Sequence, residues 1–169
     1  MTEVLGTKDS APLSWRLVCG ALAGIVATGP MTAAMRRFHR ELKVNERYPL
    51  PPREIVTSTF PGMPGEVARN TSMVAHFAYG ALSGLALAAL RRKPTVGFGI
   101  GGGVGIWLAS YLGWVPAFGI LKTADRHPAT RNAGMIVSHM VWGAAFALAQ
   151  TELLSSRPIV EDGSMKDRA

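Results

Sequence analysis

The sequence has long stretches without a formal charge. Its 18 Lys and Arg residues and its 11 Asp and Glu residues all lie outside four windows, Leu17–Met35, Asn70–Leu90, Pro94–Leu121 and Asn132–Thr151. A helix that crosses the hydrocarbon core of a bilayer needs about 20 mainly apolar residues. A helix of a soluble bundle instead carries charged residues on its outer face. The missing charges therefore argue against a soluble bundle and predict four transmembrane helices.

Cysteine is nearly absent as well, since Cys19 is the only one. A single cysteine excludes an intramolecular disulfide, so cysteine usage does not indicate the redox compartment of the protein. In a lipoprotein signal the cysteine follows the apolar run, whereas Cys19 comes before most of the first run. This run is also longer than the apolar region of a cleaved signal peptide. We therefore expect a retained helix there.

The charges that are present gather beside the apolar windows. The basic clusters are Arg36, Arg37, Arg40 and Lys43 after the first window and Arg91, Arg92 and Lys93 after the second. Bases at the ends of transmembrane helices anchor them and meet anionic lipid headgroups. The net charge of +7 thus indicates a lipid bilayer as the partner, and we expect no nucleic acid.

A motif is written twice in the chain. "RNTSMVAHFAYGA" begins at Arg69, and "RNAGMIVSHMVWGA" begins at Arg131, so a histidine, an aromatic residue and a glycine recur at the same spacing. The helices that precede the two copies correspond more weakly. Pro30 lies six residues before Arg36, and Pro116 lies six residues before Lys122. The pattern predicts two helical hairpins related as a parallel repeat, with a pseudo-twofold axis along the membrane normal.

These patterns predict an all-α membrane bundle of four transmembrane helices in one domain, residues 1–153. The helices are expected at about 15–38, 70–90, 95–121 and 132–153, with a loop at 39–69 and a disordered tail at 154–169. Both termini then lie on the same side of the membrane. The distribution of Lys and Arg between the two sides is nearly even, so it does not say which side that is.

Small residues recur at four-residue spacing in every window. The stripes are Gly20 and Gly24; Gly80 and Gly84; Gly97, Gly101 and Gly105; and Gly143 and Ala147. Helices in lipid associate by close backbone approach, which small residues permit. We therefore expect these four stripes to form the helix–helix interfaces, with Gly101 central to its own.

The first loop contains three prolines in four positions. Pro49–Pro52 is expected to be extended polyproline II, and Pro52 can also open a short helix, Pro52–Thr59, where its missing N–H costs nothing. Arg53 and Glu54 are expected to form a solvated ion pair. The segment 46–60 is a candidate docking surface for a membrane-protein partner or a second copy of the chain.

Three segments together resemble the YagU-like family of small bacterial integral membrane proteins. They are "GIVATGPMTAAM" (Gly24–Met35), "ERYPLPPREI" (Glu46–Ile55) and "HFAYGA" (His76–Ala81). The resemblance covers residues 15–152. It implies a four-helix protein of the bacterial inner membrane without an established molecular activity, and it supplies no catalytic residues.

His76 and His139 are the residues within the windows that invite a functional hypothesis. Each lies on the small-residue face of its helix, at a similar depth, where an unpaired imidazole is costly. The first hypothesis is structural, with each histidine bonded to a neighbouring helix at Thr28, Thr32 or Ser110. The second is a polar site for a proton or a small solute, and the third is haem held by two axial imidazoles.

The candidate binding residues are His76, His139, Tyr79, Trp142 and Arg53, although the two aromatic residues would also serve simply to pack. Zinc would need four ligands, which the windows do not supply, so we predict no metal site and no resident cofactor. No nucleophile–base pair or paired carboxylate is visible, so we predict no catalytic residue and no enzyme. The leading function is a structural or interaction protein, followed by a small oligomeric channel or transporter, and then by a haem-binding redox protein.

Overall fold

The computed structural model describes residues 11–156, and within that range every regular element is helical. Four helices are long and apolar enough to cross a membrane. They are α1 (Leu13–Glu41), α3 (Gly65–Leu90), α4 (Val96–Leu108) with its continuation to Ala117, and α6 (Ala129–Ser155). The four predicted membrane-spanning helices are thus confirmed, and the chain is a multi-pass membrane protein.

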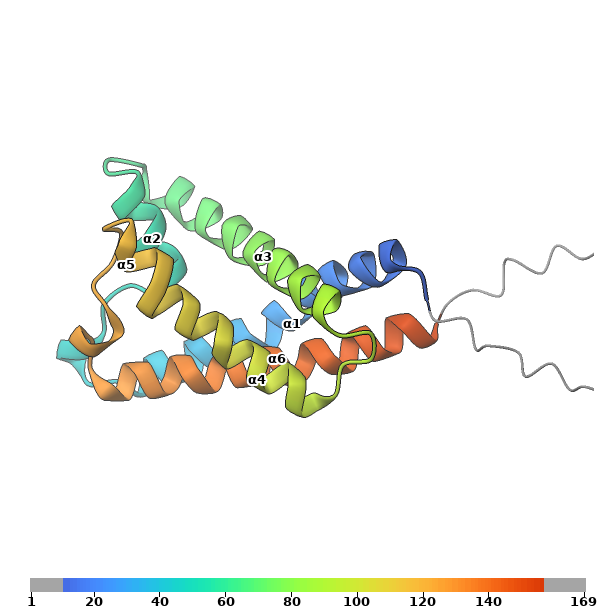
Figure 1. Cartoon of the computed structure of the whole chain (residues 1–169). Helices are drawn as coiled ribbons and strands as arrows, with labels where there is room; N and C mark the ends of the chain where they lie inside the picture. Colours follow the sequence, from blue (N-terminus) through green and yellow to red (C-terminus); the bar gives the residue numbers. More distant parts are fainter. Residues whose placement is uncertain (1–10, 157–169) are drawn as a thin grey trace, which may run out of the picture.

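The four helices form an open bundle (Figure 1). Helix α1 packs against both α3 and α6, and α6 also packs against α4. Helices α3 and α4 are joined by a short turn but make few contacts with each other. Both the start of α1 and the end of α6 lie at one end of the bundle (Figure 1).

Backbone contacts at glycine hold two of these helix pairs together. A methyl group on Gly84 would overlap the carbonyl oxygen of Gly20, and one on Gly24 would overlap that of Gly80. A methyl group on Gly143 of α6 would likewise overlap the carbonyl oxygen of Gly99 of α4. The stripes predicted on α1, α3 and α6 are therefore the real interfaces, as close packing in lipid requires.

The stripe predicted on α4 was wrong. A methyl group added to Gly97, Gly101 or Gly105 would meet nothing within 4 Å, so these three glycines face outward. The contact is made instead by Gly99 and Gly103, which lie against the backbone of α6. Glycines lie on both the packed and the exposed face of α4, so spacing alone could not show which face packs.

The third membrane-spanning helix is broken and shorter than predicted. It passes from α4 into a π-helical segment, η2 (Ala109–Trp114), in which Gly113 has non-helical dihedral angles. It then ends with α5 (Val115–Ala117), and Gly119 follows at a φ of +68°. Pro116 lacks the N–H that would continue the α-helical ladder. The predicted end at residue 121 is thereby corrected to 117.

The predicted loop 39–69 is largely helical. Helix α1 runs on to Glu41, the short 3-10 helix η1 covers Val44–Glu46, and α2 covers Pro51–Thr59. Leu50 is extended, but Pro51 and Pro52 already form the first turn of α2, so the polyproline segment is shorter than predicted. A second short 3-10 helix, η3 (Ala124–Arg126), precedes α6. Of the predicted tail 154–169, the part from 157 on lies outside the described residues.

Helix α1 also begins earlier than predicted and includes a charged residue. Arg16 is buried, and its guanidinium donates a hydrogen bond of 2.5 Å to the carbonyl oxygen of Ala88 near the C-terminus of α3. The last carbonyls of a helix have no partner within it and carry partial negative charge. The arginine thus satisfies one of them and ties α1 to α3 at this end.

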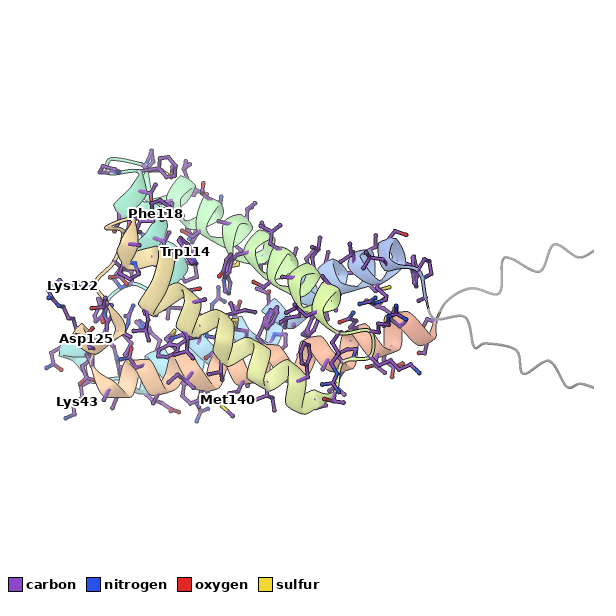
Figure 2. All side chains as sticks on the ribbon, in the orientation of Figure 1. Lys43, Trp114, Phe118, Lys122, Asp125 and Met140 are labelled. Carbon is purple, nitrogen blue, oxygen red and sulfur yellow. The ribbon has the colours of Figure 1, made fainter. Side chains whose placement is uncertain are left out.

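The arrangement predicts a topology. Lys43, Lys122 and Asp125 gather at the end of the bundle opposite the start of α1 (Figure 2). Reporter fusions after Arg40 and Lys122 should therefore report one side of the membrane, and fusions after Arg92 and Ser155 the other. Agreement between the Arg92 and Arg40 fusions would rule out four spans.

The glycine contacts predict a difference between two identical substitutions. Gly143→Leu should lower the free energy of unfolding by about 1–3 kcal/mol or more, because overpacking forces the helices apart. Gly101→Leu, on the open face of α4, should leave it nearly unchanged. Thermal unfolding in mild detergent measures both, and equal melting temperatures for the two variants would refute the assigned faces.

Candidate functional site

A cavity of about 410 Å³ lies between the four membrane-spanning helices and α2. Helices α1 and α6 form its floor, α3 and η2 form its sides, and α2 closes the end away from the start of α1. Its lining is mostly apolar and includes Met31, Met35, Ile55, Ile106 and Met135. The open α3–α4 side of the bundle thus contains a cavity that can hold another molecule.

The cavity is open to the surroundings between α3 and η2. Leu82 lines it and is 65% exposed, while Tyr79 and Trp114 line it and are each 37% exposed. The rings of Tyr79 and Trp114 contact each other, with centroids 6.0 Å apart, so these two side chains bridge part of the opening. Since these residues belong to helices that are long and apolar enough to span a membrane, an opening on this side of the bundle would face the lipid of the bilayer.

Four of the five predicted binding residues line this one cavity. They are His76, Tyr79, His139 and Trp142. The fifth, Arg53, does not line it and lies on the exposed face of α2. The structure therefore brings the two copies of the repeated motif to a single site and leaves Arg53 outside it.

The aromatic residues, not the histidines, make the polar bonds between helices. The hydroxyl groups of Tyr79 on α3 and Ser110 on η2 are hydrogen-bonded at 2.8 Å. The indole N–H of Trp142 on α6 lies 3.3 Å from the Thr28 hydroxyl and 3.3 Å from the Gly24 carbonyl of α1. Each aromatic residue of the repeat thus joins its helix to the next hairpin.

Neither histidine bonds a neighbouring helix, which corrects the partners predicted for them. The Nδ1 of His139 bonds to the carbonyl oxygen of Met135 in its own helix, at 2.8 Å. The Nε2 of His76 is buried and has no hydrogen-bond partner among the described residues. Thr28 and Ser110, which we expected to receive these imidazoles, are occupied by the aromatic residues instead.

Sequence reasoning missed the residue that holds α2 in place. Arg131, at the start of α6, is 2% exposed. Its guanidinium donates to Glu54 Oε2 at 2.8 Å, to the Pro49 carbonyl at 3.0 Å and to the Tyr48 carbonyl at 3.2 Å. The predicted pair of Arg53 with Glu54 was therefore wrong, because Glu54 turns inward to a buried cation.

Tyr48 extends this clamp to the loop before α6. The Arg131 guanidinium lies 3.6 Å from the centroid of the Tyr48 ring, close enough for a cation–π interaction. The Tyr48 hydroxyl is hydrogen-bonded to Nδ1 of His127, and the two rings are stacked. Burial raises the pKa of the Tyr48 phenol, although the charge of Arg131 lowers it, so the hydroxyl keeps its proton for that hydrogen bond.

The repeated motif includes Arg131, but the motif alone does not predict that this arginine is buried. Arg69 and Arg131 open the two copies of the motif, but the side chain of Arg69 is 65% exposed and lies 3.9 Å from Glu66. One copy is a surface residue and the other is buried, and only the position of α2 decides which. No group of three His, Cys, Asp or Glu side chains suited to a metal occurs within residues 11–156.

The clamp predicts that removing Arg131 loosens α2. Arg131→Met keeps the bulk but leaves Glu54 without its cation, and losing one partner of a buried pair costs about 3–5 kcal/mol. Hydrogen exchange across residues 46–60 should increase strongly, while the four long helices stay protected. Arg69→Met is the matched control and removes only a surface pair, worth about 0–1 kcal/mol. Unchanged exchange at 46–60 in Arg131→Met would contradict the clamp.

The bond pattern predicts which repeated residues stabilise the bundle. Tyr79→Phe and Trp142→Phe should each lower the free energy of unfolding by about 0.5–2 kcal/mol, since each removes an interhelical hydrogen bond. His76→Leu and His139→Leu should be neutral or stabilising, because neither imidazole bonds another helix. Unfolding in detergent tests this, and a larger loss in the histidine variants than in the aromatic ones would reverse the assignment.

No protein-family model, curated protein or solved structure matches the chain.

Proposed function

We propose that the chain is a bacterial inner-membrane protein that binds a small amphiphile taken from the lipid bilayer. The observation that carries this proposal is the apolar cavity, which opens sideways between α3 and η2. A ligand dissolved in the bilayer reaches such an opening without passing through water.

The size of the cavity suits a small ligand. Its volume of about 410 Å³ falls in the range of roughly 300–1,000 Å³ that is typical of small-molecule sites. Such sites are mostly apolar and hold a few polar groups that orient the ligand. Here the polar residues of the lining include His76, His139 and Tyr111.

Binding refines the structural or interaction role expected from the sequence. The inner face of the segment 46–60 is already used within the chain, since Pro51 and Val56 are buried and Glu54 is held by Arg131. A partner protein or a second copy would have to use the outer face, which carries Arg53 and the 53% exposed Phe60. Docking on that face remains a prediction.

A pore through a single chain is the weaker alternative. A path from the cavity to the end of the bundle where α1 starts would cross two tight contacts. One is the backbone contact of Gly20 with Gly84, and the other places Leu87 over Gly102. Neither contact can open without separating the helices, so transport would require a path between several copies of the chain.

Two further proposals concern the origin of the chain. Duplication is supported by the bonds of the repeat, because Trp142 of α6 reaches α1 and Tyr79 of α3 reaches η2. An exchange of the two hairpins would pair these two bonds, although α1 packs closely on α6 while α3 makes few contacts with α4. Membership of the YagU-like family is supported by the three matching sequence segments alone and stays a prediction.

The proposed function predicts that filling the cavity blocks binding. An anthracene-labelled hydrocarbon should bind the wild-type protein saturably, at one molecule per chain. Ala78→Trp on α3 places a large ring in the cavity lining and should weaken binding at least tenfold. Fluorescence titration in nanodiscs measures this effect.

The matched control is Ala86→Trp, because Ala86 lies on the same helix, is exposed and does not line the cavity. It should bind the probe as the wild type does. Probe binding that is non-saturable, or equally weakened in both variants, would refute the site.

A further inference from the structure

We propose that the cavity selects an amphiphile with an uncharged aromatic hydroxyl head, such as an alkylated phenol or hydroquinone, and this inference rests on the proposed function. It follows from three features of the lining, which are its charge, its unused hydrogen-bonding groups and its aromatic walls.

The lining carries no formal charge. None of the described residues around the cavity is Lys, Arg, Asp or Glu. The nearest buried cation, Arg131, already has its guanidinium at 2.8 Å from the Glu54 carboxylate. A charged head buried among these residues would lack a counter-ion, and burying an unpaired charge costs several kcal/mol. The ligand head is therefore neutral.

The unused polar groups match a hydroxyl. The side chain of Tyr111 is 5% exposed, and its hydroxyl is inaccessible to solvent, lies beside the Arg131 guanidinium and has no acceptor among the described residues. An O–H group donates, so a ligand oxygen that enters there would serve as its acceptor. In a neutral His139 the proton sits on Nδ1, where it bonds to Met135, so Nε2 is an acceptor. A hydroxyl both accepts and donates, and thus serves both groups.

The buried imidazole of His76 adds a third polar position. Its Nε2 lacks a partner in the described structure, and it lines the same cavity as His139 and Tyr111. Leaving such a group buried and unsatisfied costs about 1–3 kcal/mol. As the ring lies, Nε2 is inaccessible to solvent, so it does not face the cavity. A rotation of the His76 side chain would bring Nε2 to a second hydroxyl or a carbonyl on the ligand ring, as in a hydroquinone, and would recover that energy.

Aromatic side chains form much of the wall around these groups. Tyr79, Tyr111, Trp114 and Trp142 all line the cavity. Two of them are held by stacking behind the wall, since Trp142 lies on Phe146 at an interplanar angle of 7° and Tyr111 on Trp107 at 18°. Rings fixed in this way offer flat or edge contacts to another ring, so an aromatic head fits better than an aliphatic alcohol.

The test compares ligands that differ only in the head. Para-octylphenol, octylbenzene and para-octylbenzoate are titrated into wild-type protein in nanodiscs, in competition with the anthracene-labelled probe and with concentrations expressed per lipid. The phenol should bind at least tenfold more tightly than octylbenzene, and the benzoate should bind no better than octylbenzene.

Variants then locate the hydroxyl. His139→Leu should abolish the preference for the phenol while leaving octylbenzene binding intact, and His139→Gln, which keeps an acceptor, should retain part of it. Ser138→Ala is the control, because Ser138 is fully buried next to His139, bonds Gly134 and does not line the cavity. It should keep the full preference.

Each outcome has one meaning. Equal binding of the phenol and octylbenzene, or tighter binding of the benzoate, would overturn the selection of a neutral hydroxyl while leaving the proposed function standing. A preference that survives in His139→Leu would also overturn it. Failure of all three ligands to displace a saturably bound probe would likewise overturn it, whereas failure of the probe itself to bind saturably would instead remove the proposed function.

Discussion

Backbone contact at glycine is the constraint on which the rest of the structure depends. Gly24 with Gly80 and Gly20 with Gly84 bring α1 and α3 together, and Gly143 with Gly99 and Gly103 does the same for α4 and α6. No side chain separates these backbones, so each pair packs as closely as helices can. Helices α3 and α4 have no such contact along most of their length, and the cavity occupies the space that this difference leaves.

The clamp at Arg131 turns that space into a closed-ended site. Without α2, the cavity would be open at the end where Pro51, Ile55 and Val56 now form its wall. Helix α2 is only nine residues long, too short to be stable by itself. It is held by packing against α3 and by a buried arginine that satisfies a carboxylate and two carbonyl oxygens. The energy of that clamp thus stabilises the shape of the site.

The membrane-spanning helices could be predicted from the sequence because exclusion of charge from hydrocarbon is a local property of each window. The interfaces of α1, α3 and α6 could also be predicted, since each has one dominant small-residue stripe. Helix α4 could not, because its many glycines leave no face distinct.

The sequence predicted four residues of the site, but it did not predict which of them bond to other helices. His76, Tyr79, His139 and Trp142 share a cavity, yet which of them bond to other helices depends on side-chain reach across the bundle. The longer phenol and indole reach Ser110 and Thr28, and the shorter imidazoles do not. The burial of Arg131 depends on the segment 48–54 folding back over the start of α6, which no local pattern encodes.

The central claim is that a molecule from the bilayer occupies the cavity of the native protein. Native mass spectrometry of the protein purified in mild detergent, together with its absorption spectrum, tests this claim most directly. The account predicts one small neutral amphiphile bound per chain and no Soret band. A protein that carries no bound molecule under conditions that retain bound lipids, or one that carries haem, would contradict it.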